Sequence, residues 1–367
     1  MKKRIFWLTA CYFYDVDLPI VPEITKHHSI DWHIFLENAN GFHDDEIRSG
    51  AFPKNDNLNV IVENKAKYRT KDPRRFFLFL KLIRTIKQGK YDFVYIDILD
   101  QFYLFPLLYL FRVKNLVFAS HDVLPHVGFG KLFVMLNKFM MKRFNNFQVF
   151  SQEQYHIFVK MYPEKNVFMA RLALKDFGIS NLNPPTDKIV FTYFGIIREN
   201  KGIEHLIAAG NKLHESHQGK FIIKILGDTS EWSKYQKQIK YSEAFQLKIS
   251  RIEDSEIPDI FCSSHFIVLP YKDVTQSGIL NIAYNYCTPA ICSDFKGFRE
   301  YVDHGHNGFL FTPMDNDDLY QKMKHIIEHF EDYPQIKQNL KEFIEKNCSI
   351  NMIVNEYLKF FDKKLSN

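Results

Sequence analysis

Short, continuous apolar runs alternate with helical stretches along the whole of this 367-residue chain. Runs such as 92–97, Asp-Phe-Val-Tyr-Ile-Asp, are typical of parallel strands that are covered on both faces. The alternation stops at 181–187, Asn-Leu-Asn-Pro-Pro-Thr-Asp, and then begins again. The pattern therefore predicts two doubly wound α/β domains, with a boundary in that linker.

The alternation predicts individual elements in each half. In the first half, strands are expected at 3–11, 31–36, 58–63, 92–97, 115–119, 147–151 and 167–170, and helices at 73–89, 129–144 and 152–161. In the second half, strands are expected at 188–194, 221–226, 245–249, 265–269, 289–293 and 308–311, and helices at 202–215, 232–242, 278–286 and 315–329. A last helix at 350–365 follows the second alternation.

Charge is spread unevenly between the halves. Residues 1–180 contain 26 Lys and Arg against 18 Asp and Glu, whereas residues 181–367 contain 22 against 25. The first half is therefore expected to face an anionic partner. Two basic, aromatic stretches, 71–87 and 131–143, read either as core helices with a solvated face or as helices that dock on an anionic membrane surface. The sequence contains no nucleic-acid-binding module.

Nothing in the sequence predicts secretion or a membrane span. The first ten residues fit a β-strand better than a signal peptide, because their apolar run is short. The most apolar stretch, 102–111, is half the roughly 20 residues that a membrane span needs. The five cysteines are scattered and odd in number, which favours thiols in a reducing cytosol. The chain is expected to be cytoplasmic, with peripheral contact at the inner face of the cell membrane.

A strand, a glycine turn and a helix occur in that order around 188–213, and two cations lie on the connecting loop. The loop contains Gly195, Arg198 and Lys201. The N-terminus of a helix attracts anions, and a forked guanidinium beside a mobile ammonium suits a diphosphate. The alternative is an ordinary loop with solvated charges.

A second turn, Thr275-Gln-Ser-Gly278, follows the strand expected at 265–269 and opens the next helix. Gly278 permits close approach of the backbone, and Ser277 or Thr275 is expected to cap the helix. Its N–H groups suit a phosphate or a sugar hydroxyl. The alternative is a plain capped helix.

Three features together resemble the retaining nucleotide-sugar glycosyltransferases of family 4. They are the Gly…Arg-x-x-Lys-Gly loop, the Leu-Pro-Tyr…Ser-Gly-x-Leu turn, and the Pro-Ala-Ile…Gly-Phe-x-Glu…Asn-Gly-Phe segment that ends at 311. The resemblance covers the C-terminal half well and the N-terminal half in outline. It implies the GT-B fold: two Rossmann-like domains facing across a cleft, with an acceptor-binding domain at 1–182, a nucleotide-sugar-binding domain at 183–348, and a helix at 349–367 that returns to the first domain.

The resemblance also assigns roles to residues. Gly195, Arg198 and Lys201 would hold the donor diphosphate with Ser277 and Gly278, and Arg198 and Lys201 would offset its charge as it departs. His121 and Asp122, which follow the strand at 115–119, match the loop that faces the sugar in the family. His121 would act in catalysis. Glu300 matches an acidic position and is a weak candidate for contact with the nucleoside.

The chain departs from the family at the second turn. Many members carry two glutamates eight positions apart there, whereas this chain has no Glu between Ile257 and Arg299. Thr275 and Gln276 replace the first glutamate and are expected to bind sugar hydroxyls. The ribose contact is left without an obvious partner.

The absence of a Gly-x-Gly-x-x-Gly fingerprint argues against an NAD enzyme, and no metal-type spacing occurs, so no cofactor and no metal are expected. The predicted function is transfer of a sugar from a UDP- or GDP-type donor to a hydroxyl on a glycan or lipid-linked acceptor in bacterial surface polysaccharide synthesis. The alternatives are a nucleotide-sugar epimerase and a non-catalytic partner protein with the same fold.

Overall fold

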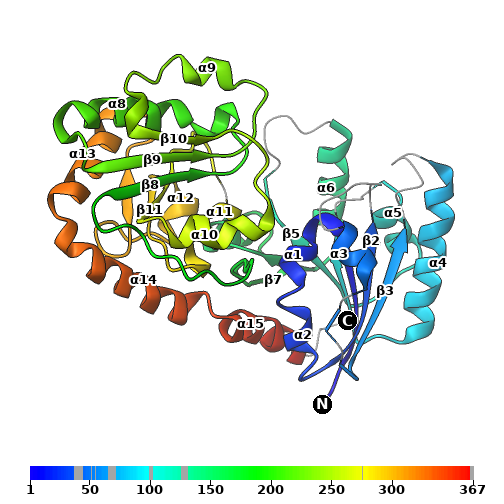
Figure 1. Cartoon of the computed structure of the whole chain (residues 1–367). Coiled ribbons are helices and arrows are strands. Elements are labelled where there is room, and N and C mark those ends of the chain that lie inside the picture. The colour runs from blue at the N-terminus through cyan, green and yellow to red at the C-terminus, as the bar shows by residue number, and fades with distance from the viewer. Residues whose placement is uncertain are drawn as a thin grey trace. The chain divides into compact units, whose positions relative to one another are not determined.

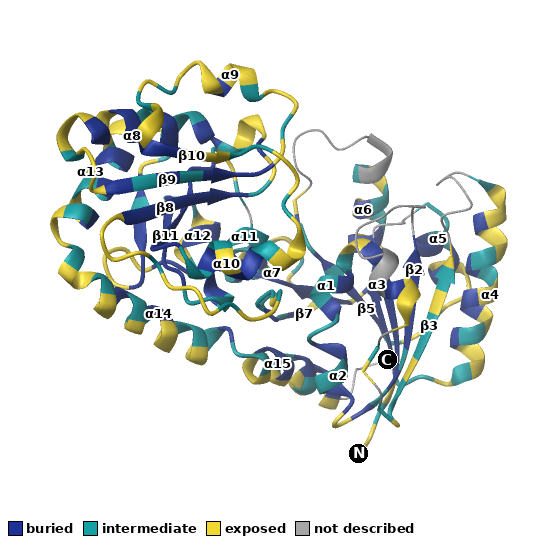
Figure 2. Ribbon diagram, in the orientation of Figure 1, coloured by how far each residue is buried: buried dark blue, intermediate teal, exposed yellow. Residues whose placement is uncertain are grey.

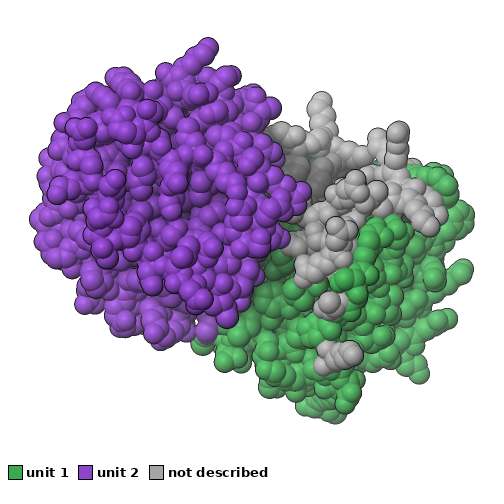
Figure 3. All heavy atoms as spheres, in the orientation of Figure 1, with its two compact units in different colours: residues 1–173, 350–367 green, residues 174–349 purple. Residues whose placement is uncertain are grey.

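The computed structural model describes residues 1–36, 44–50, 52–53, 55–64, 72–98, 102–124, 131–274 and 276–363, without the side chains of 44–46 and 131–133. It divides into two compact units, which Figure 3 colours separately. The first contains residues 1–173 and 350–367, and the second contains residues 174–349. Each unit is built on one parallel sheet with helices on both faces, which confirms the predicted fold class (Figure 1).

The first unit contains a seven-stranded sheet in the order β3-β2-β1-β4-β5-β6-β7. Its strands are β1 (Arg4–Ala10), β2 (Ser29–Leu36), β3 (Leu58–Asn64), β4 (Phe93–Asp97), β5 (Leu116–Ser120), β6 (Asn146–Val149) and β7 (Asn166–Met169). Its helices are α1 (Tyr14–Asp17), α2 (Val21–Ile24), α3 (Asp44–Ser49), α4 (Pro73–Gly89), α5 (Leu104–Leu110), α6 (Lys131–Arg143), α7 (Gln152–Met161) and α15 (Ile350–Asp362). A 3-10 turn, η1 (Cys11–Phe13), follows β1.

Successive side chains of β1 point to opposite faces of the sheet and pack into two different hydrophobic layers, because side chains alternate along a strand. Phe6 and Leu8 of β1 pack with α4, α5, α6 and α7, whereas Ile5 and Trp7 pack with α1, α2 and α15. Figure 2 shows most strands buried, the edge strand β3 partly exposed, and the outer sides of the helices exposed. Among the described helices, none has the length and apolarity needed to cross a bilayer.

The last helix belongs to the first unit, as the resemblance implied. Tyr357, Phe360 and Phe361 of α15 are buried against the sheet. The Tyr357 hydroxyl accepts a 2.8 Å hydrogen bond from Nε2 of Gln148, which lies in β6. The C-terminal helix therefore completes a core that the first residues of the chain begin.

The second unit contains a six-stranded sheet in the order β10-β9-β8-β11-β12-β13. Its strands are β8 (Ile189–Phe194), β9 (Phe221–Leu226), β10 (Phe245–Lys248), β11 (Phe266–Leu269), β12 (Ala290–Ser293) and β13 (Phe309–Phe311). Its helices are α8 (Ile203–His217), α9 (Trp232–Gln236), α10 (Ile257–Cys262), α11 (Gly278–Asn285), α12 (Lys296–Arg299), α13 (Asn316–Glu328) and α14 (Tyr333–Asn347). Helices α8 and α13 cover one face, and α10, α11 and α12 cover the other.

Several stretches differ from the sequence prediction. The expected elements did not include α1, α2, α3, α5, α10, α12 or α14. Helix α9 ends at Gln236, six residues before the predicted end at 242. The physical reason is Asn211 of α8, whose side chain accepts from the Lys240 N–H at 3.0 Å and donates to the Gln238 carbonyl at 2.7 Å. These bonds hold the segment after Gln236 in a turn and bind backbone groups that a longer helix would use.

Candidate active site

The strand order of the second unit identifies the edge where a ligand is expected. Strand β8 pairs with β9 on one side and β11 on the other, so the chain leaves β8 and β11 in opposite directions across the sheet. Ligands of doubly wound sheets bind at the carboxyl edge, beside such a switch point. The loops that follow β8 and β11 are the two loops that the sequence singled out.

The loop after β8 depends on glycine at two positions. Gly195 has φ +118°, and a Cβ there would lie 3.3 Å from Ile279 Cδ1, which places this loop against the start of α11. Gly202 has φ +62°, and a Cβ would lie 2.0 Å from the Pro270 carbonyl oxygen. No residue with a side chain fits there without movement of the backbone. The turn therefore brings the loops after β8 and β11 into direct contact.

Lys201 and Arg198 are cations without a carboxylate partner in the described part of the chain. The Lys201 ammonium lies 3.7 Å from the centre of the Tyr271 ring, which is buried at the end of β11. Burial lowers the pKa of Lys201 to about 8, and the charge of Arg198 contributes in the same direction. The Arg198 side chain is exposed. Two cations that repel each other and lack a counter-ion form a site for an anion.

A third lysine nearby is paired instead. Lys272 Nζ lies 2.5 Å from the Glu204 carboxylate in the first turn of α8, and the Lys272 N–H donates to the Asn200 carbonyl at 2.9 Å. These contacts fix the two loops to each other. Lys272 therefore has a structural partner, which distinguishes it from Lys201 and Arg198.

The turn after β11 caps helix α11 as predicted, and Ser277 is the capping residue. Its hydroxyl accepts from the Leu280 N–H at 3.3 Å. The side-chain Nε2 of Gln276 is buried and has no hydrogen-bond partner among the described residues. Thr275, the other residue predicted to bind sugar, lies outside the described residues. A buried donor without a partner beside a helix N-terminus suits a polar ligand.

The structure adds Lys175 to this edge of the second unit. Its ammonium would lie 3.8 Å from a Cβ at Gly278, the first residue of α11. No sequence signal pointed to Lys175, because it precedes β8 and belongs to none of the three motifs. Tyr271, in contrast, lies within the Leu-Pro-Tyr motif, but no role had been assigned to it.

Glu300 lies at the C-terminal cap of α12, after β12. Glu300 therefore also lies at the carboxyl edge of the sheet. The strand that it follows, β12, is the neighbour of β11, whose loop adjoins the switch point. Nearby Asp294 forms two bonds with Arg299, at 2.5 and 2.8 Å, and this partner lowers the pKa of Asp294. Asp294 is thus a structural turn residue.

The first unit has its own switch point between β1 and β4, and His121 lies beside it. The His121 ring is stacked between Phe13 of η1 and Phe150 after β6, with centroid distances of 3.8 and 4.3 Å. Its Nε2 lies 2.8 Å from Oδ1 of Asp97, the last residue of β4. The His121 side chain is 17% exposed and that of Asp97 is fully buried. One ring edge is therefore held by Asp97, the ring faces are covered by Phe13 and Phe150, and a small part of the ring is exposed.

A second buried carboxyl group, Asp17, lies behind this pair. Burial and the charge of Asp97 raise the pKa of Asp17 well above its ordinary value. The Asp17 carboxyl group accepts hydrogen bonds from Trp7 Nε1 at 2.9 Å and from the Thr9 hydroxyl at 2.5 Å. Burial also raises the pKa of Asp97, whereas the neighbouring His121 lowers it.

The other polar residues near this edge differ in exposure. Tyr14 and Asp17, in the segment after β1, are buried. No sequence motif indicated that Asp97 would hold His121. Asp122 is partly exposed in the turn after β5, where its carbonyl oxygen accepts from the Ser120 hydroxyl at 3.4 Å. His126, which follows the same strand in the sequence, lies outside the described residues.

Within the residues that the structure describes, no group of three or more His, Cys, Asp or Glu side chains is arranged to hold a metal ion. The cations at the edge of the second unit, where an anionic ligand is expected, are Arg198 and Lys201.

Comparison with known proteins gives a family and a fold. The profile of the family described as glycosyl transferases group 1 matches residues 160–343. An uncharacterized glycosyltransferase of Methanocaldococcus jannaschii is 23% identical over 179 residues, which are 48% of this chain and 45% of that protein. An uncharacterized 41.2 kDa protein in the cps region of Klebsiella pneumoniae is 21% identical over 303 residues, covering 77% of this chain and 82% of that protein.

A solved structure extends the likeness to both units. Anabaena Alr3699/HepE in complex with UDP and glucose superposes with a TM-score of 0.71 at 16% identity, covering 98% of this chain and 99% of that chain. At this identity the match establishes the fold.

Gly202→Ala tests the contact between the two loops. The variant combines a left-handed backbone with a clash against the Pro270 carbonyl, so its free energy of unfolding should fall by more than about 2 kcal/mol. Gly305→Ala is the matched control, because φ is +76° there and a Cβ would meet nothing within 4 Å. It should cost about 1–2 kcal/mol. Chemical denaturation measures both, and equal losses would contradict the close approach at Gly202.

Proposed function

The chain belongs to the glycosyl transferases group 1, and on that premise we propose that Arg198 and Lys201 bind the diphosphate of its sugar donor. The chain is a glycosyltransferase with the GT-B fold, and its group uses nucleotide sugars with retention at the anomeric carbon. The observation that carries the proposal is the pair of cations without a carboxylate partner at the β8 switch point, against the capped N-terminus of α11.

Sugar transfer places new negative charge on the departing nucleoside diphosphate. The bond between the anomeric carbon and the diphosphate oxygen breaks, and the acceptor oxygen forms the new bond as its proton leaves. Cations and helix N–H groups that are already in position stabilise this charge without reorganisation. Lys201 and Arg198 supply the cations, Ser277 and Gly278 supply the start of the helix, and Gly195 lets the loop approach it.

The sugar and nucleoside contacts are proposed on less direct grounds. Gln276 has a buried donor without a partner, and we assign it with Thr275 to the sugar hydroxyls. Glu300 lies at the end of α12 and is assigned to the nucleoside. In the first unit, Asp122 and His121 are assigned to the sugar, and His121 to catalysis.

Asp97 gives His121 a fixed orientation. When the His121 Nε2–H donates to the carboxylate of Asp97, the other ring nitrogen keeps its lone pair and accepts a hydrogen bond from a substrate hydroxyl. The stacked Phe13 and Phe150 prevent rotation of the ring. Asp97 is therefore proposed as a positioning residue that acts through His121.

The proposed donor is a UDP- or GDP-sugar, and the proposed acceptor is a hydroxyl on a lipid-linked glycan at the inner face of a bacterial membrane. Two observations support this choice. HepE was solved with UDP and glucose, and the Klebsiella relative is a protein of a cps region. The basic composition of the first half is compatible with an anionic membrane surface.

A panel of UDP, GDP, ADP and their sugar conjugates tests the donor assignment by thermal shift. One nucleotide family should raise the melting temperature by mass action. Arg198→Ala and Lys201→Ala should weaken that shift and lower kcat/KM for transfer by on the order of a hundredfold to a thousandfold. Lys237→Ala, which removes an exposed cation beyond α9, is the matched control and should change neither quantity.

Other outcomes separate the alternative functions. Near-normal transfer by both alanine variants would disprove the diphosphate assignment. Release of free nucleotide and free sugar from the donor without an acceptor would favour an epimerase. Donor binding without transfer to any acceptor would favour a non-catalytic protein.

The lowered pKa of Lys201 predicts a pH dependence of donor binding. The ammonium is charged below pH 8 and attracts the diphosphate, whereas above that pH it is neutral in the free protein. Affinity for the nucleoside diphosphate should therefore fall above pH 8, by up to about tenfold for each pH unit. Titration calorimetry from about pH 7 to about pH 10 measures this slope. The Lys201→Arg variant stays charged over this range, so the decrease in affinity that is due to residue 201 should disappear. An identical slope of affinity against pH in the variant would contradict the assignment.

Asp97→Asn tests the positioning role. The variant keeps the shape of the side chain but removes the carboxylate that holds His121, so kcat should fall about 10- to 100-fold and the pH profile of kcat should shift. The affinity for nucleoside diphosphate should stay constant. Asp17→Asn is the matched control, because it alters a buried carboxyl group that accepts from Trp7 and Thr9 and not from His121, and its kcat should stay near that of the wild type. Equal effects of the two substitutions would indicate a merely structural role for Asp97.

A further inference from the structure

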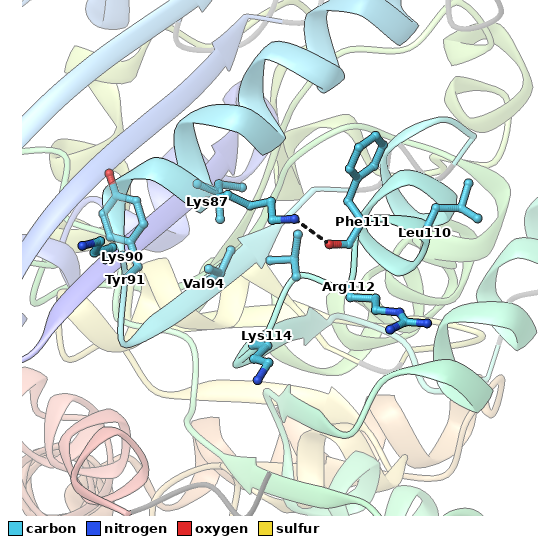
Figure 4. Close-up of a pocket in the computed structure, with 10 residues that line it drawn as sticks. Lys87, Lys90, Tyr91, Val94, Leu110, Phe111, Arg112 and Lys114 are labelled. Atoms are coloured by element: carbon cyan, nitrogen blue, oxygen red, sulfur yellow. Dashed lines mark hydrogen bonds between the residues drawn. The ribbon is translucent and has the colours of Figure 1, made fainter.

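A second concave site lies at the opposite edge of the first sheet. The cavity has a volume of about 610 Å³ and is formed where α4 and α5 end and where β4 and β5 begin (Figure 4). Val94, which lines it, pairs with Leu116 at the start of the two strands. Asp97 and His121 lie at the other ends of those strands. The cavity is therefore distinct from the site assigned to catalysis.

The cavity is lined by four cations and by no carboxylate. Lys87, Lys90, Arg112 and Lys114 all contribute to its wall, and Figure 4 shows them around an apolar centre. Lys87 donates to the Phe111 carbonyl at 3.3 Å. The other three make no hydrogen bond or ion pair through their side chains with any residue that the structure describes. Four like charges without a counter-ion repel one another, and an anionic ligand would relieve that repulsion.

Two of these cations are held in a backbone conformation that ordinarily favours glycine. Lys90, the C-cap of α4, has φ +51°, and Arg112, two residues after α5, has φ +50°. Glycine or asparagine is the usual residue where a chain leaves a helix in this conformation. The helix dipole also favours a cation near the C-terminus of each helix. The dipoles do not account for Lys114, which lies four residues beyond α5.

Exposed apolar side chains adjoin the cations. Leu110 is 70% exposed and Phe111 is 41% exposed, and both line the cavity. Tyr109 is also exposed and lies beneath the Arg143 guanidinium of α6, at 5.1 Å from its ring centre. This mixture of apolar and cationic side chains is the composition of a surface that enters the headgroup region of a bilayer.

The neighbouring helices extend the same chemistry. The segments 73–89, 104–110 and 131–143, which form α4, α5 and α6, contain nine Lys and Arg residues and no Asp or Glu. Helix α5 contacts both α4 and α6. A small soluble phosphate ester would need the cations but not the exposed Leu110. Charge complementarity together with the apolar rim therefore favours an anionic lipid surface over a ligand in solution.

We propose that this cavity binds the phosphate of an anionic lipid headgroup at a bilayer surface, with Leu110 and Phe111 inserted beside it. The inference rests on the proposed membrane location of the acceptor, and it specifies which surface of the first unit would contact that membrane. It does not depend on which nucleotide the second unit binds.

Vesicle flotation tests the proposal with full-length protein. Vesicles of phosphatidylcholine with phosphatidylglycerol should carry the wild-type protein at low salt, and vesicles of phosphatidylcholine alone should not. The triple variant Lys90→Glu, Arg112→Glu, Lys114→Glu should lower partitioning by on the order of a hundredfold. The matched control Lys234→Glu, Lys237→Glu, Lys240→Glu changes net charge equally at exposed positions of the second unit, and it should bind within about threefold of the wild type.

A second variant and a soluble competitor make the test decisive. Leu110→Asp alters one exposed side chain, so it should fold normally and still reduce partitioning. Normal flotation of the triple variant would overturn the proposal. Binding of soluble glycerol phosphate without flotation on phosphatidylglycerol vesicles would also overturn it, because the cavity would then recognise a free phosphate ester and not a bilayer surface.

The same samples report donor binding independently through the nucleotide thermal shift. If the wild-type protein binds nucleotide but does not float, the lipid inference fails and the donor assignment stands. If it floats through the cavity but no nucleotide binds, the lipid inference stands and the donor assignment fails.

Discussion

Parallel strand pairing is the constraint on which both candidate sites depend. Every described strand of a sheet runs in the same direction, so the loops that leave the strands gather at one edge and those that enter them gather at the other. In the second unit this brings Lys201, which follows β8, over Tyr271, which follows β11, although 70 residues separate them in sequence. In the first unit it brings Asp97 to His121. The chemistry of each edge is thus set by which residues end or begin neighbouring strands.

The electrostatics of the two carboxyl edges differ. In the second unit, the Lys201 ammonium is poorly solvated because it is partly buried, and it has no carboxylate partner among the described residues. This lowers the stability of the ligand-free protein but leaves the charge available to an anion. In the first unit, Asp17 and Asp97 are both buried, and the pKa of each is raised. Burial is the largest cause of both shifts; the charge of Asp97 adds to the shift of Asp17, whereas His121 opposes the shift of Asp97. Of these two buried carboxyl groups, Asp97 is the one that bonds to a histidine.

The sequence predicted the features that depend on local pattern. Continuous apolar runs located the strands, and the Gly195 and Ser277 turns were identified because glycine and capping residues act within a few positions. Helix α14 was not predicted, since Ile336 and Leu340 are its only buried side chains among those described, which leaves a weak apolar stripe. Asp97 and Lys175 acquire their positions through strand neighbours and a distant helix start, and no pattern in a single sequence contains that information.

Helix α15 makes the first unit discontinuous in the chain, with the second unit inserted between its two parts. Trp7 in β1 is synthesised long before Tyr357 and Phe361, whose rings cover it. On the ribosome, the inserted unit therefore has its complete sequence earlier than the first unit. The first sheet keeps one apolar face uncovered until α15 has been synthesised. That interval makes the first sheet a natural client for chaperones during synthesis.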